Sequence, residues 1–125
     1  MVYYDTLVEI MKDYTVKLII ILAFIVSDVI SGLFKAFANE GYNSSIMRQG
    51  MIHKMTEIFC FLFCVLCDFT LPRLNITLPF SLATGITVYL VFMEIGSIVE
   101  NVGLLNPDIG KYLTGLFEKL KDKHD

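Results

Sequence analysis

Three long apolar runs follow one another along the chain, separated by short polar segments. They cover about residues 18–38, 55–71 and 78–99. A helix needs roughly 20 mainly apolar residues to cross a hydrocarbon core about 30 Å thick, and only the second run is short for this. Acidic residues precede the first run, unlike the basic start of a cleaved signal peptide, so we interpret it as a retained span. The pattern predicts an all-α integral membrane protein with three transmembrane helices.

The two ends of the chain carry an amphipathic pattern instead. Residues 1–17 separate apolar and tyrosine side chains from most of the charged ones, which favours a short interfacial helix, with a frayed polar leader as the alternative. Residues 107–125 combine an apolar face with several lysines, and predict an amphipathic basic tail on lipid or on a neighbouring helix. A basic loop over 39–54 joins the first two spans, and a short turn begins at Pro72.

Composition supports the membrane assignment. Of the 125 residues, 55% are hydrophobic, and the mean hydropathy is +0.64, which is too apolar for a small soluble domain. The length allows one domain, 1–125. The formal charge of −3 gives no sign of nucleic-acid binding.

Cysteines and carboxylates do not form a recognisable catalytic or metal motif. Cys60, Cys64 and Cys67 share one helical stripe, but no histidine or fourth cysteine lies near at the same depth. We therefore expect packing residues, without a metal or a disulfide framework. The sequence offers no nucleophile–base pair and no glycine-rich phosphate loop. It predicts no enzyme activity and no cofactor.

Each span carries one polar stripe at helical spacing. On the first span the stripe contains Phe24, Asp28, Ser31, Gly32 and Lys35. On the second it contains Glu57, Cys60, Cys64 and Asp68. On the third it contains Thr87, Leu90, Glu94, Ser97 and Asn101. A charge at the centre of a span costs about 2.5 to 3.5 kcal/mol on insertion scales, so these residues must be satisfied or used. The stripes either pack the three helices together or also line an aqueous lesion.

Three charged residues fall at one depth. At about 1.5 Å per residue, Lys35, Glu57 and Glu94 lie roughly 8 to 10 Å towards the same side of their span centres. We expect Lys35 to bridge to Glu94, with Glu57 as the second choice, within or between subunits. The alternative is that Lys35 extends to the headgroups. Asp28 is too far along its helix to pair with Lys35, so we expect it to be protonated or solvated.

The basic residues predict an orientation. Seven of the ten lysines and arginines flank the 39–54 loop or lie in the tail. The positive-inside rule then places this loop and the C-terminus in the cytoplasm, and the N-terminus outside.

Several motifs together resemble the toxin secretion/phage lysis holin family. The first motif is Asp28-x3-Gly32-x2-Lys35-Ala36 in the first span. The second consists of Ser44-Ser45, Gly50 and Lys54 in the predicted loop, which also contains Arg48. The third is Glu94-x2-Ser97-x2-Glu100-Asn101, followed by a proline and a lysine-rich tail. The similarity covers about residues 20–120. Two features depart from the family pattern: His53 before Lys54, and the abundance of cysteine and phenylalanine in the second span.

The resemblance implies a function in membrane lysis or secretion. Members of that family are small multi-span proteins of the bacterial cytoplasmic membrane that open lesions for phage endolysins or for large toxins lacking signal peptides. We therefore expect a homo-oligomer that accumulates in the lipid bilayer, associates through the polar stripes and opens a non-selective hole. The alternative is a small non-lytic channel or transporter subunit with a protonatable Asp28.

Overall fold

A computed structural model of the chain describes residues 2–40 and 43–124, which form helices and turns without strands. The long helices are α1 (Val2–Lys35), α2 (Ser44–Thr70), α3 (Leu82–Leu105) and α4 (Pro107–His124). A π-helical turn, η1 (Ala36–Glu40), follows α1, and a 3-10 turn, η2 (Leu71–Leu74), follows α2. The helical segments Asp5–Ala38, Ser44–Leu74 and Leu82–Leu105 are long and apolar enough to cross a membrane. The predicted all-α fold with three spans is confirmed.

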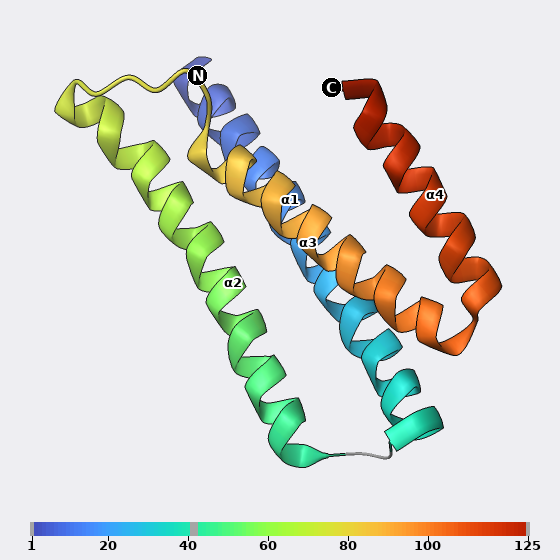
Figure 1. Cartoon of the computed structure of the whole chain (residues 1–125). Coiled ribbons are helices and arrows are strands. Elements are labelled where there is room, and N and C mark those ends of the chain that lie inside the picture. The colour runs from blue at the N-terminus through green and yellow to red at the C-terminus, as the bar shows by residue number, and fades with distance from the viewer. Residues whose placement is uncertain (1, 41–42, 125) are drawn as a thin grey trace.

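The three spanning helices lie lengthwise against one another (Figure 1). Helix α2 runs opposite to α1 and α3, and α4 folds back so that it runs opposite to α3. The contact of α3 with α1 is the most extensive, and α2 packs on α3 more than on α1. Helix α3 is therefore the element that holds the bundle together.

Helix α1 does not divide at the predicted start of the first span. It runs without a break through residue 17, so the segment predicted as a separate interfacial helix is the first part of α1. No glycine or proline interrupts residues 2–31, and an uninterrupted helix satisfies its own backbone hydrogen bonds.

Helix α2 begins much earlier than the predicted second span. Asn43 caps it, because its side-chain oxygen accepts hydrogen bonds from the backbone N–H groups of Ser45 at 3.0 Å and Ile46 at 3.3 Å. Most of the predicted 39–54 loop is therefore helical. This correction moves Arg48, Gly50 and Lys54 onto the first turns of a spanning helix.

The apolar core is small. It consists of Ile21, Ile25, Phe61, Ala83 and Leu90. Most other large apolar side chains are exposed on the outer faces of the helices, as expected where lipid replaces neighbouring protein.

Helix α4 approaches α3 through a pair of glycines. A Cβ atom added to Gly110 would lie only 2.5 Å from the Cα atom of Gly103. Leu113 and Phe117 of α4 are half-buried, whereas Lys111 and Lys119 are exposed. The predicted packing of the tail on a neighbouring helix is therefore seen in the contact of α4 with α3, whereas its placement on lipid stays a prediction.

Candidate functional site

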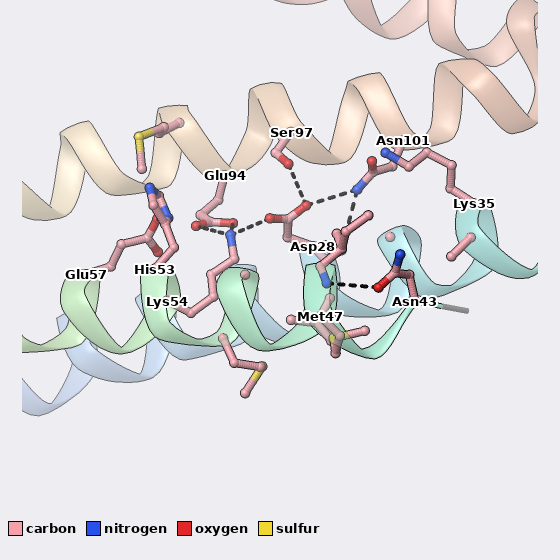
Figure 2. Close-up of a pocket in the computed structure, with 17 residues that line it drawn as sticks. Asp28, Lys35, Asn43, Met47, His53, Lys54, Glu57, Glu94, Ser97 and Asn101 are labelled. Atoms are coloured by element: carbon pink, nitrogen blue, oxygen red, sulfur yellow. Dashed lines mark hydrogen bonds and ion pairs between the residues drawn. The ribbon is translucent and has the colours of Figure 1, made fainter. Parts of the chain in front are cut away.

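Lys54 of α2 lies at the centre of a buried polar cluster formed by three helices (Figure 2). Its Nζ atom donates hydrogen bonds to both carboxylate oxygens of Glu94 on α3, each at 2.7 Å. It also forms a hydrogen-bonded ion pair with Oδ2 of Asp28 on α1. The Lys54 side chain is 14% exposed and that of Glu94 is 1% exposed. One amino group thus joins the three spanning helices.

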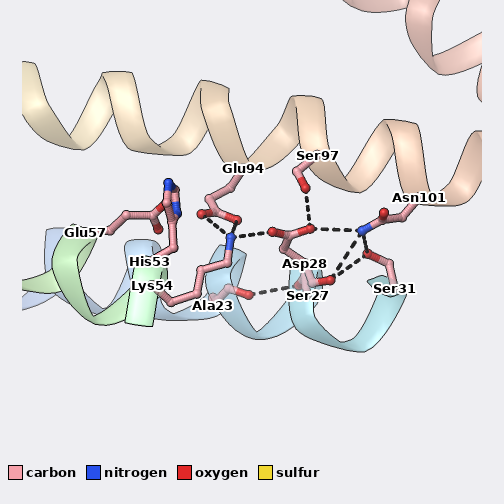
Figure 3. A network of polar contacts seen from close by, with 10 residues as sticks. All are labelled: Ala23, Ser27, Asp28, Ser31, His53, Lys54, Glu57, Glu94, Ser97 and Asn101. Carbon is pink, nitrogen blue, oxygen red and sulfur yellow. Dashed lines mark hydrogen bonds and ion pairs between the residues drawn. The ribbon is translucent and has the colours of Figure 1, made fainter. Parts of the chain in front are cut away.

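The carboxylate of Asp28 has further donors from α3 (Figure 3). Ser97 Oγ donates to its Oδ1 atom at 2.7 Å, and Asn101 Nδ2 donates to the same oxygen at 3.0 Å. Asn101 Nδ2 also donates to Ser31 Oγ at 3.0 Å, while Ser31 Oγ donates to the carbonyl oxygen of Asp28. Asp28 is thereby satisfied by a charged partner and two neutral ones, as a buried carboxylate requires.

Helical spacing explains why these side chains meet. Glu94, Ser97 and Asn101 are three and four residues apart on α3 and share one face. Gly32 of α1 faces this stripe, because a Cβ atom added to it would lie 3.7 Å from Asn101 Nδ2, at an ordinary contact distance. The small residue and the polar ones on the stripe therefore act together at the α1–α3 contact.

A cavity of about 540 Å³ extends from the cluster towards the start of α2 (Figure 2). Asp28, Lys35, Lys54, Glu57 and Glu94 are the acidic and basic residues in its lining, together with His53. Gly50 also lines it. Within the described part of the chain, no group of three or more histidine, cysteine or acidic side chains is placed to hold a metal ion.

The structure brings together most, but not all, of the residues predicted to line a hole or contact a helix. Asp28, Ser31, Gly32, Lys35, Glu57, Glu94, Ser97 and Asn101 lie in the cluster or around its cavity. Of the predicted loop motif, Gly50 and Lys54 reach this site, whereas Ser44, Ser45 and Arg48 are exposed on the first turns of α2. Cys64 packs against the apolar core instead. Asp68 lies outside the cluster and contacts the start of α3.

Lys54 forms the ion pair with Glu94 that the sequence analysis predicted for Lys35. Within the chain, Glu94 pairs with Lys54, and Lys35 forms no ion pair with a residue whose side chain is described. Asp28 is paired too, so the prediction that it is protonated or solvated is wrong for the single chain. A contact between Lys35 and Glu94 of another chain stays a prediction. The missed signal was the continuous helical spacing of Gly50, Lys54, Glu57, Phe61 and Cys64 across the supposed loop boundary.

Asp68 forms a second polar site at the junction of α2 and α3. Its Oδ1 atom accepts a hydrogen bond from the backbone N–H of Leu82 at 2.7 Å, and its Oδ2 atom accepts one from Ala83 N–H at 3.1 Å. Ser81 Oγ also donates to it, and Tyr14 Oη of α1 donates at 3.3 Å. The carboxylate therefore caps the N-terminus of α3, where the helix dipole favours a negative charge.

Comparison with known protein families identifies the chain. No match was found among curated proteins or solved structures. The sequence profile of the bacteriophage holin family matches residues 6–122. The match covers almost the whole chain and includes every residue of the buried cluster. Three membrane-length helices agree with a family of membrane proteins. The chain belongs to the bacteriophage holin family.

Proposed function

We propose that the chain acts as a holin, which assembles with copies of itself in the cytoplasmic membrane of a bacterium and opens a non-selective hole. The cargo is an endolysin or a large toxin without a signal peptide. Family membership and the three helices of membrane-spanning length support this proposal. Neither an enzymatic step nor a nucleic-acid partner is part of it.

The observation that carries the proposal is the polar cluster enclosed by three apolar helices. In a single chain, Asp28, Lys54 and Glu94 satisfy one another, so the outer faces can present apolar side chains to lipid. When chains associate, the same groups can exchange partners between chains or face water. The buried polar residues would then provide both cohesion between subunits and the lining of the hole.

The contacts of Asp28 favour this function over a channel or transporter that uses Asp28 as its proton carrier. A carboxylate that receives hydrogen bonds from Lys54, Ser97 and Asn101 is stabilised in its ionised form. If Asp28 carried protons, these hydrogen bonds would have to break in every transport cycle.

We further propose that the start of α2 and the C-terminus face the cytoplasm. The basic bias around Arg48 and in the tail supports this orientation. Ser45 is exposed, so a cysteine placed there in a chain without native cysteines reports the side directly. An impermeant thiol reagent should label Ser45→Cys only after the cells are permeabilised, and labelling in intact cells would reverse the orientation.

Controlled expression in a bacterium tests the hole. The expected result is simultaneous loss of a small dye and of a folded cytoplasmic enzyme after the protein has accumulated. Dye or ion loss without loss of the enzyme would indicate the non-lytic channel instead. If both are retained at high membrane abundance, the proposed function is wrong.

A matched pair of variants connects leakage to the cluster. Lys54→Met removes the amino group that joins the three helices, whereas Lys12→Met removes an exposed lysine near the start of α1. We expect the first variant to change the time of leakage and the pattern of chemical cross-linking between chains. The second variant should behave like the wild type.

A further inference from the structure

A second hollow, of about 650 Å³, lies between α3 and α4, where α4 folds back beside α3 (Figure 1). None of its lining residues belongs to the cavity beside the polar cluster. Its lining contains four glycines: Gly96 and Gly103 from α3, and Gly110 and Gly115 from α4. Gly103 and Gly110 are needed where the two helices approach each other, but a Cβ atom added to Gly96 or Gly115 would meet nothing within 4 Å. Glycine within a helix is less favourable than alanine, and packing within the described chain does not explain it at these two positions.

The hollow carries an excess of negative charge. The charged residues in its lining are Glu100, Lys111 and Glu118, so one negative charge remains uncompensated. All three side chains are exposed, and none forms an ion pair with a residue whose side chain is described. A partner that fits this hollow should therefore be apolar along most of its length and carry one cation.

Helix α2 presents a surface of this kind on the face that the bundle leaves free. Its buried residues, Glu57 and Phe61, lie on one side of the helix. The opposite side carries a straight row of exposed residues at spacings of three and four, which we call the α2 ridge. The ridge consists of Arg48, Ile52, Met55, Phe59, Leu62 and Leu66. Each of its five apolar members is more than half exposed.

The contact between Lys54 and Glu94 determines which residues of α2 and α3 lie at the same depth. The two helices run in opposite directions, and the hydrogen bonds from Lys54 to Glu94 place these two residues at about one level (Figure 1). Arg48 lies six residues before Lys54, and Glu100 lies six residues after Glu94. Because both helices rise by the same distance per residue, Arg48 and Glu100 are also at about one level.

Copies of the chain that are inserted in the same direction carry the same residues at the same depth of the bilayer. The α2 ridge of one copy can therefore meet the hollow of the next with Arg48 opposite Glu100 and with Ile52 opposite Gly96. A cation then faces an acid, and a large apolar side chain faces a glycine, which allows close approach of membrane helices. We infer that the hollow between α3 and α4 binds the α2 ridge of a second copy of this chain, with Arg48 of that copy paired to Glu100.

This inference rests on the proposed function, because it supplies the contact through which copies assemble. The ridge and the hollow are different surfaces, and α2 and α4 lie on different sides of α3, so each copy can bind one neighbour through each surface (Figure 1). Such head-to-tail contacts build closed rings or open arcs. Both surfaces lie outside the buried cluster, so chains can associate while Lys54 still holds Asp28 and Glu94 together.

Disulfide formation between two different copies tests the contact. After the native cysteines are replaced, one copy carries Ile52→Cys and a second copy with a distinguishable tag carries Gly96→Cys, where the added side chain has room. We expect oxidation of membranes that contain both copies to give the mixed dimer. In the control, the second copy carries Ser27→Cys instead, an exposed position of α1 at the same level, because Asp28 contacts Ser97 of α3. Absence of the mixed dimer with Gly96→Cys, or equal yields with both second copies, overturns the inference.

An exchange of charges tests the proposed ion pair in the same assay. Arg48→Glu in the copy with Ile52→Cys places two acids opposite each other and should lower the yield of mixed dimer about fivefold, the upper range for an exposed ion pair. Glu100→Arg in the copy with Gly96→Cys should restore the yield. Lys12→Glu changes an exposed lysine of α1 and should leave the yield unchanged. If Arg48 extends to lipid headgroups instead, Glu100→Arg will not restore the yield, and the inference is overturned.

The two measurements separate this contact from the hole, because neither requires lysis. Mixed dimers without leakage would support the contact and contradict the proposed hole. Leakage without the mixed dimer would overturn the contact and leave the proposed hole in place.

Discussion

Asp28 and Asp68 are both aspartates within membrane-length helices, but the chain stabilises them in different ways. Asp28 meets an amino group and two polar side chains, all contributed by other helices. Asp68 forms no ion pair with a described residue and relies on two backbone N–H groups and two hydroxyl groups. The first site depends on side chains, whereas the second depends largely on the fixed backbone at the start of α3.

The difference indicates which site could rearrange in the proposed assembly. Backbone N–H groups at a helix terminus keep their direction as long as the helix exists, so the Asp68 cap is suited to hold α2 and α3 together permanently. The partners of Asp28 are side chains on separate helices, and the proposed homo-oligomer would bring copies of the same side chains on neighbouring chains. Only the Asp28 site can therefore exchange internal partners for intermolecular ones without unfolding a helix.

Removing the amino group from the Asp28 site should have the largest effect. Lys54→Met leaves Asp28 and Glu94 buried without a cation, and breaking a buried ion pair in this way costs about 3 to 5 kcal/mol. Reversible unfolding of the protein in detergent or bilayer discs measures the loss. Lys12→Met, at an exposed position, should change the free energy of unfolding by less than about 0.5 kcal/mol.

A triple variant sharpens this prediction. Replacing Asp28 by Asn and Glu94 by Gln together with Lys54→Met removes all three charges, so no uncompensated charge remains. The triple variant should be more stable than Lys54→Met alone. Equal or lower stability would mean that the cluster is not held by its charges.

Breaking the Asp68 cap should have an intermediate effect. Asp68→Ala removes the acceptor for two N–H groups and two hydroxyls, and loss of a cap costs about 0.5 to 2 kcal/mol. Asp68→Asn keeps one carbonyl oxygen as an acceptor and should lose less. Asp5→Ala, an exposed control, should stay close to the wild type. Similar losses for Asp68→Ala and Asp5→Ala would contradict the cap.

The comparison of the two sites also shows what the sequence could predict. The three spans follow from apolar length alone, and the α1 and α3 stripes meet because residues three and four apart share a helix face. Such local rules place Ser97 and Asn101 on one face of α3, but they did not predict that Asp28 of α1 would accept hydrogen bonds from both. They could not identify Lys54, because polar residues before the second apolar run resemble a loop until the Asn43 cap extends the helix.

Contacts that depend on how the chain turns were not predictable. Asp68 reaches the N–H groups of Leu82 and Ala83 only because η2 and the following turn bring α3 back beside α2. The close approach of Gly103 and Gly110 likewise depends on the angle at which α4 leaves α3. Hydrophobic periodicity contains no information about either angle.

Ser97→Ala sharpens the comparison within the Asp28 site. The variant removes one neutral donor but leaves Lys54 and Asn101 on the carboxylate. Side-chain hydrogen bonds between membrane helices contribute about 0.6 kcal/mol on average, with a maximum of about 1.7, so we expect a loss of about 1 kcal/mol in unfolding measurements. Ser27→Ala is the matched control, because Ser27 Oγ donates only to the Ala23 carbonyl of its own helix. A loss as large as that of Lys54→Met would mean that hydrogen bonds, and not charges, dominate the cluster.

Tyr14→Phe should have the smallest effect and tests whether the Asp68 site is mainly a backbone cap. The hydroxyl of Tyr14 donates to Asp68 at 3.3 Å, the longest of the four bonds at that carboxylate. The phenyl ring keeps its packing against the apolar core in the variant, so only this hydrogen bond is lost. We expect the free energy of unfolding to fall by about 0.5 kcal/mol or less, and to match Tyr89→Phe, which changes an exposed tyrosine of α3, within that margin. A loss as large as that of Asp68→Ala would instead make the link from α1 the main function of Asp68, and the contrast between a backbone cap and a side-chain cluster would no longer hold.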